Sequence, residues 1–214
     1  MGIKELYNLY TKSYKVVKDT RDDVTNAIYF SLKGESFDGN KYALDALKNG
    51  ASYAVIDDED FKVDQRMILV EDVLICLQDL ATYHRQELKI PILALTGSNG
   101  KTTTKELINA VLNEKYACYA TKGNFNNHIG VPLTLLSMTP EHNFGVVEMG
   151  ANHQLEIANL CEIALPDFGY ITNFGRVHLE GFGSFEGVVE GKTEMYRHLK
   201  KLGKKVFVNQ EDSI

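Results

Sequence analysis

The chain has 214 residues, of which 44% are hydrophobic, and a formal net charge of −6 at pH 7. This length and composition suffice for one large domain or two small ones with a sizeable core. The negative charge argues against general nucleic-acid binding, and no apolar run approaches the ~20 residues of a membrane-spanning helix.

The amino-terminal sequence lacks the basic region and the apolar stretch of a signal peptide. The three cysteines, Cys76, Cys118 and Cys161, are widely spaced, which argues against a disulfide framework and against a zinc site. We therefore expect a cytoplasmic protein that binds no nucleic acid and does not insert into a membrane. The sequence carries no indication of its oligomeric state.

The first 90 residues predict a small α/β domain. Short strands are expected at 16–17, 27–30, 53–56 and 67–70, with a helix over 40–49. A longer helix over 72–89 places these residues on one stripe: Val73, Leu77, Leu80, Ala81, His84 and Leu88. Because the rest of the stripe is apolar, we expect His84 to be a core residue rather than a ligand. The turn before Pro91 is the expected domain boundary.

From residue 91 onward the pattern alternates between strands and helices. Strands are expected at 91–96, 117–121, 144–149, 168–173 and 205–209, and helices over 101–114, 132–138, 154–164 and 184–200. This alternation predicts a mostly parallel sheet of the P-loop type with helices on both faces. Ligands of such sheets bind at the carboxyl ends of the strands, so we expect the site there.

A glycine-rich loop, Thr96-Gly-Ser-Asn-Gly-Lys-Thr-Thr-Thr104, joins an apolar strand to a helix in which Leu107, Ile108 and Val111 recur at helical spacing. Backbone N–H groups and the helix dipole favour phosphate at such a loop. The residues expected to hold a nucleotide are Gly97, Ser98, Asn99, Gly100, Lys101, Thr102 and Thr103. Lys101 can reach the terminal phosphates, and the hydroxyl of Thr102 can bind Mg²⁺. Leu95 stands where the strict motif has glycine, so the loop is a variant; the alternative is a glycine-rich turn without function.

Two further residues follow strand ends in the same predicted sheet. Glu148 closes an apolar strand, where a Mg²⁺ ligand is expected, although a solvated glutamate would fit the same pattern. His178 follows the strand at 168–173 and could bind a metal or a phosphate, or be an ordinary surface histidine.

Lys192 lies on the apolar stripe of the helix over 184–200, between Val189 and Tyr196. Burying an ammonium group is unfavourable unless it is paired. Its stem could pack while the charge reaches solvent, it could meet an anion such as phosphate, or CO₂ could convert the amine to a carbamate that binds a cation.

The loop 123–130 offers asparagines and a histidine that suit either a polar ligand or a turn.

Four ordered segments together resemble the Mur ligases, ATP-dependent amide-forming enzymes of peptidoglycan synthesis. They are the loop 96–104, the segment 123–136, the string Glu148-Met-Gly-Ala-Asn-His153 and the segment 171–184. The last two look like the member that adds D-alanyl-D-alanine to UDP-N-acetylmuramoyl-tripeptide. The resemblance covers nearly the whole chain.

The resemblance implies roles for these residues. Lys101 and the loop would hold the phosphates of ATP, Thr102 and Glu148 would bind one Mg²⁺, and His178 with a carbamylated Lys192 would serve a second. Lys101, His178 and Lys192 would be the catalytic residues. The family usually has Ala-Lys-Gly-Glu around the lysine, whereas this chain has Gly191-Lys-Thr-Glu194.

The resemblance also implies a UDP-sugar-binding domain at 1–90 and an incomplete ATP-binding domain at 91–214. Thr20 and Arg21, in a segment that usually reads aspartate-serine-arginine, would contact the UDP-muramoyl substrate together with Asn126 and Asn127. The strand at 205–209 resembles one from the middle of the family's ATP domain. We therefore expect the chain to be an amino-terminal portion, without the carboxy-terminal domain, that does not ligate in isolation.

The implied reaction forms an acyl phosphate on the tripeptide carboxylate, which the amine of D-alanyl-D-alanine then attacks. A sibling Mur ligase or a folylpolyglutamate-type ligase is the enzymatic alternative. The other alternative is a fragment that binds nucleotide or UDP-sugar and catalyses nothing.

Overall fold

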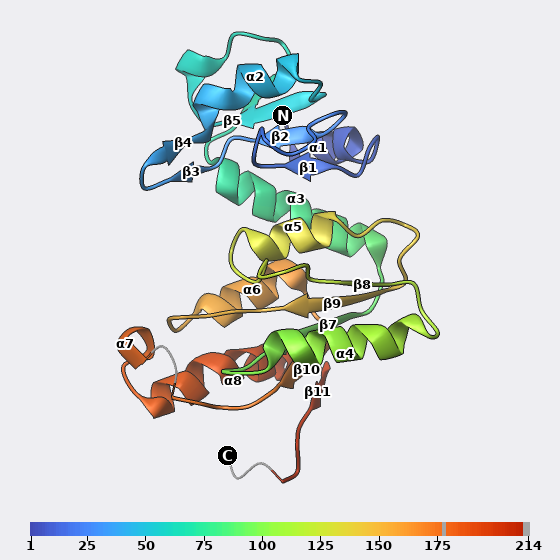
Figure 1. Cartoon of the computed structure of the whole chain (residues 1–214), viewed down its shortest axis with the longest axis vertical. Helices are drawn as coiled ribbons and strands as arrows, with labels where there is room; N and C mark the ends of the chain where they lie inside the picture. Colours follow the sequence, from blue (N-terminus) through green and yellow to red (C-terminus); the bar gives the residue numbers. More distant parts are fainter. Residues whose placement is uncertain (177–178, 212–214) are drawn as a thin grey trace. The chain divides into compact units, whose positions relative to one another are not determined.

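The computed structural model describes residues 1–176 and 179–211. The chain forms two compact units, Met1–His84 and Arg85–Ile214, and both are mixed α/β structures (Figure 1). Of the helices in the described ranges, none combines the length and the apolar character needed to cross a membrane.

The first unit is built on a parallel four-stranded sheet with the order β1-β2-β5-β6. Its strands are β1 (Val16–Val17), β2 (Ile28–Phe30), β5 (Tyr53–Ile56) and β6 (Met67–Leu69). The unit also contains α1 (Ile3–Tyr10), a hairpin of β3 (Lys33–Gly34) and β4 (Phe37–Asp38), the 3₁₀ helices η1 (Gly39–Tyr42) and η2 (Glu59–Phe61), α2 (Ala43–Lys48), and most of α3 (Val73–Leu88). The strands and the helix over 72–89 confirm the sequence-based expectation, whereas α1 and the hairpin were not expected.

The core of this unit lies between α2 and the sheet, where Tyr29, Leu47, Ala54 and Ile56 are buried. His84 is also fully buried, and its ring nitrogens lie 3.3 Å from the hydroxyls of Tyr7 and Tyr10. The prediction that His84 is a core histidine is therefore confirmed.

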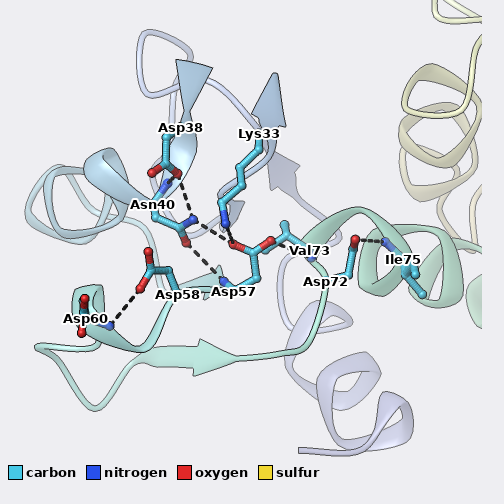
Figure 2. A network of polar contacts seen from close by, with 9 residues as sticks. All are labelled: Lys33, Asp38, Asn40, Asp57, Asp58, Asp60, Asp72, Val73 and Ile75. Carbon is cyan, nitrogen blue, oxygen red and sulfur yellow. Dashed lines mark hydrogen bonds and ion pairs between the residues drawn. The ribbon is translucent and has the colours of Figure 1, made fainter. Parts of the chain in front are cut away.

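A polar network fixes the hairpin to the end of β5 and the start of α3. Figure 2 shows Lys33 and Asn40 pointing toward the carboxylate of Asp57. Their side-chain nitrogens each lie 2.8 Å from its Oδ1. The side chain of Asn40 also donates to Asp38, and the Val73 N–H points at the other oxygen of Asp57. Burial opposes ionisation of Asp57, but the hydrogen bonds from Lys33 and Asn40 outweigh it and hold the pKa of Asp57 below its ordinary value.

The second unit is a parallel five-stranded sheet with the order β11-β10-β7-β9-β8. Its strands are β7 (Ile92–Thr96), β8 (Cys118–Ala120), β9 (Phe144–Glu148), β10 (Phe168–Ile171) and β11 (Lys205–Phe207). Its helices are α4 (Lys101–Asn113), α5 (Gly130–Leu136), α6 (Glu156–Ala164), α7 (Leu179–Phe182) and α8 (Phe185–Lys201). The predicted parallel sheet with helices on both faces is confirmed.

The connections explain this layering. The step from β7 through α4 to β8 runs one way along the sheet, and the later steps through α5, α6 and α8 run the other way. Because such crossovers are right-handed, α4 covers one face and the other three helices cover the opposite face. Contacts of α6 with both α5 and α8 agree with that arrangement (Figure 1).

Candidate active site

The predicted phosphate loop connects β7 to α4 at the carboxyl end of the central strand. Gly97 and Gly100 have φ of +151° and +75°, values that side chains rarely adopt. Space also requires glycine at position 97, because a Cβ there would lie 1.8 Å from Oγ1 of Thr172. The loop therefore has the backbone conformation that its glycines predict.

Lys101 begins α4 and is half-buried. Its ammonium group donates to the carbonyl of Gly97 at 2.9 Å and lies 3.5 Å from the carbonyl of Ser98. The ammonium group of Lys101 is thus bound to carbonyls of the loop. A small change of the side chain would bring it to a phosphate bound in the same loop.

Thr102 and Glu148 come together as the two predicted ligands of one Mg²⁺. The Thr102 hydroxyl donates to Oε2 of Glu148 at 3.2 Å, and the carboxylate is 1% exposed at the end of β9. Asn126 donates its side-chain amide to Oε1 of the same carboxylate at 2.9 Å. Asn126, predicted to bind substrate, is therefore hydrogen-bonded to Glu148, predicted to bind the metal.

Asn127, the neighbouring candidate, binds backbone groups at the start of α5. Its Oδ1 accepts hydrogen bonds from the N–H groups of Ile129 and Gly130 and so caps the start of α5. Thr103 is exposed in the first turn of α4.

Lys192 is 1% exposed on α8, and its ammonium nitrogen lies 5.7 Å from the centre of the Phe182 ring. Burial, and then the charge of Lys101, lower the pKa of Lys192 from 10.5 to about 8. No carboxylate among the described residues is paired with it. A buried ammonium group that feels a second positive charge suits a polyanion or a modification that reverses its own charge. The remaining candidate, His178, lies outside the described residues.

Thr172, Asn173 and Gly175 complete the loop's surroundings and were not among the expected site residues. The N–H of Ser98 donates to the carbonyl of Asn173, and Gly175 exchanges hydrogen bonds with the Ser98 side chain. Thr172 and Asn173 bind the backbone of Asn99. Their position directly after a buried strand was the available signal.

The first unit carries a separate cavity of about 490 Å³ around the segment predicted to bind UDP-sugar. It is lined by Lys18, Asp19, Thr20, Arg21, Phe37 and Tyr42. Arg21 is exposed and pairs with Asp19, which holds the pKa of that carboxyl well below its usual range. The rings of Phe37 and Tyr42 stack with centres 5.3 Å apart and are both partly exposed. This aromatic pair was not predicted.

Known proteins resemble this chain in sequence and fold. The family model of the Mur ligase middle domain matches residues 95–214. The UDP-N-acetylmuramoyl-tripeptide–D-alanyl-D-alanine ligase of Haemophilus influenzae is 44% identical over 193 residues, which cover 88% of this chain and 42% of that enzyme. The enzyme of the same name from Bacillus subtilis is 41% identical over 204 residues, covering 94% of this chain and 44% of its own.

A solved structure agrees with these sequence relatives. The MurF ligase from Thermotoga maritima in complex with ADP superimposes with a TM-score of 0.80 at 34% identity, covering 89% of this chain and 44% of that one. The chain therefore spans less than half the length of the relatives it matches.

Proposed function

The chain belongs to the Mur ligase family, and from this premise we propose that it is part of the enzyme that joins D-alanyl-D-alanine to UDP-N-acetylmuramoyl-tripeptide with ATP. The pairing of Thr102 with Glu148 beside the glycine loop carries the proposal. The relatives from Haemophilus influenzae and Bacillus subtilis, both named as this ligase, support the choice of member.

In this proposal residues 91–214 bind ATP and residues 1–90 bind the UDP-sugar. The hydroxyl of Thr102 and the carboxylate of Glu148 are hard oxygen donors, which fit Mg²⁺. When bound, Mg²⁺ neutralises charge on the transferring phosphoryl group. Lys101 would release its loop carbonyls and bind the terminal phosphates, and a carbamylated Lys192 would hold a second Mg²⁺ together with His178.

The reaction proposed for the whole enzyme has two steps. The tripeptide carboxylate accepts the terminal phosphoryl group of ATP, ADP leaves, and the carboxylate becomes an acyl phosphate. The amine of D-alanyl-D-alanine attacks the acyl carbon, and phosphate leaves as the amide bond forms. The role of this chain's residues is to position the phosphates and the muramoyl substrate and to stabilise charge.

In the first unit, Thr20 and Arg21 line a cavity that also contains Lys18 and the aromatic pair. Lys18 and Arg21 offer positive charge to a diphosphate, and Phe37 and Tyr42 offer a flat apolar surface to a base. In the second unit, Asn126 and Asn127 are the proposed contacts to the muramoyl part of the substrate.

The test is a binding panel on the 214-residue chain. Calorimetric titration with UDP-muramoyl peptides of different length should show preference for the tripeptide, and Mg²⁺–ATP should bind separately. Lys101→Ala should weaken ATP binding by roughly ten- to a hundredfold, as expected when a charged hydrogen bond is lost, and leave UDP-sugar binding unchanged. Lys115→Ala, an exposed lysine beyond the other end of α4, is the control. Equal ATP affinity of the wild-type and Lys101→Ala proteins would contradict the proposal.

A further inference from the structure

The backbone of Asn99, in the middle of the glycine loop, is held by two side chains that follow β10. Its N–H donates to Oδ1 of Asn173 at 3.0 Å. Its carbonyl accepts from Nδ2 of Asn173 at 3.0 Å and from Oγ1 of Thr172 at 2.7 Å. Both polar groups of one loop residue are therefore bound by a segment more than 70 positions away in sequence.

The pattern of donors and acceptors determines the orientation of the Asn173 amide. Its oxygen must face the N–H of Asn99 and its nitrogen must face the carbonyl, because the reverse would oppose donor to donor and acceptor to acceptor. The N–H of Ser98 also donates to the carbonyl of Asn173, which adds a third contact to the same residue. The β10 segment thus forms a clamp, defined by Thr172 and Asn173, on the loop.

The clamp sets the direction of the next peptide group. In a planar trans peptide the carbonyl and the N–H point in opposite directions. Since the Asn99 carbonyl faces Thr172 and Asn173, the N–H of Gly100 points away from them. Within the described part of the chain, this N–H meets no acceptor. Gly100 has φ of +75°, and glycine tolerates the alternative orientation of this peptide at low cost.

We propose that Thr172 and Asn173 are positioning residues that keep the Asn99–Gly100 peptide in the orientation that presents the Gly100 N–H to phosphate. Without the clamp the peptide can rotate, and a carbonyl oxygen then faces the anion in place of a donor. The N–H of Asn99 is already committed to Asn173, so the loop's donor at this point is Gly100. This inference rests on the proposed binding of ATP at the loop.

The experiment compares Thr172→Ala, Thr172→Ser and Asn173→Ala in the 214-residue chain. Calorimetric titration with Mg²⁺–ATP should show roughly tenfold weaker binding for each alanine variant, the expected effect of losing a hydrogen bond that orients a donor to a charged group. Thr172→Ser keeps the hydroxyl and should bind within about twofold of wild type. If Thr172→Ser keeps the affinity for Mg²⁺–ATP that Thr172→Ala loses, the hydroxyl of Thr172 is responsible and not the packing of its methyl group.

A second measurement does not depend on affinity. In ¹H–¹⁵N spectra without nucleotide, the Gly100 amide should give one signal in wild type, and a second or broadened signal in Asn173→Ala, because two peptide orientations become populated. Wild-type affinity in both alanine variants, or failure of serine to restore it, would overturn the inference. If the wild-type chain binds no ATP, that result contradicts the proposed function and not the clamp. The clamp is tested without nucleotide, and a single unchanged Gly100 signal in Asn173→Ala would refute it.

Discussion

The hydroxyl of Thr102 lies 3.2 Å from Oε2 of Glu148, although 46 positions separate the two residues. The parallel pairing of β7 with β9 produces this contact, since it sets Leu95 opposite Glu148 at the end of the sheet. Thr102 follows a few residues later, in the first turn of α4. A hydroxyl and a carboxylate at this edge form an oxygen pair suited to Mg²⁺ beside a phosphate loop.

Glu148→Gln should weaken ATP binding about tenfold or more in Mg²⁺ and change it little in EDTA. Glutamine preserves the shape and can still accept from Thr102 or Asn126, but it removes the charge that attracts the cation. Calorimetric titration under both conditions measures the difference. Glu114→Gln, an exposed carboxylate at the end of α4, should match wild type. An equal loss in EDTA would mean that Glu148 acts without a metal.

Lys192 makes stability depend on pH in a direction that follows from its lowered pKa. The folded-state pKa of about 8 lies below the ordinary value of 10.5, so protonation opposes folding. The penalty is complete below pH 8 and disappears as pH rises toward 10.5. Lys192→Met should therefore be more stable than wild type at pH 7, by on the order of 3 kcal/mol at most, and this advantage should shrink by pH 10.

Urea unfolding in CO₂-free buffer at both pH values checks this prediction. Lys200→Met, which removes an exposed lysine from the same helix, controls for the general effect of lost charge. A stability difference between wild type and Lys192→Met that stays constant from pH 7 to 10 would show that the amine is not strained by burial.

The carbamate proposed for Lys192 can be detected by ¹³C NMR, because its carbon comes from CO₂. With ¹³C-labelled bicarbonate, Mg²⁺ and ATP, wild type should give a protein-bound carbamate signal that Lys192→Met lacks. The neutral amine is the form that reacts with CO₂, and a lowered pKa makes that form more abundant near pH 8. Absence of the signal under loaded conditions, with ATP shown to be bound, would contradict carbamylation.

The local features of the site could be predicted from sequence because each lies within one continuous segment. An apolar run, a glycine loop and a helical repeat specify β7, the loop and α4 without knowledge of their neighbours. The helix was correct, but its expected apolar positions were not all buried. Leu107 and Val111 are 64% and 72% exposed, whereas Lys105 is fully buried. Spacing predicts a helix but does not determine which face meets the sheet.

The clamp on Asn99 and the aromatic cavity of the first unit could not be predicted, because tertiary pairing creates them. Thr172 reaches the loop only because β10 lies beside β7 in the sheet. Phe37 and Tyr42 stack only because an unexpected hairpin precedes η1. To predict the clamp, the sequence would have to reveal the order of the strands in the sheet. To predict the aromatic pair, it would have to reveal the short hairpin.

Glu194 of α8 supplies the amino-terminal cap of α6. Its carboxylate is 6% exposed and accepts from the N–H groups of Leu155, at 2.6 Å, and Ala158, at 3.0 Å. Leu155, the residue at the cap position, provides no side-chain hydrogen bond and has a left-handed backbone. A negative charge at a helix amino terminus is favourable, and α6 obtains one from another helix in addition to its own Glu156.

Glu194→Ala should lower the free energy of unfolding by about 2–3 kcal/mol, because it removes a charged acceptor and leaves the N–H groups of Leu155 and Ala158 without it. Glu194→Gln retains an acceptor oxygen but loses the charge, so its loss should be smaller, about 1 kcal/mol. Urea unfolding of both variants at pH 7 measures these changes. Glu190→Ala, one turn earlier on α8 with an exposed side chain, should cost less than about 0.5 kcal/mol. If Glu194→Ala is as stable as Glu190→Ala, the cap contributes nothing to holding α6 on α8.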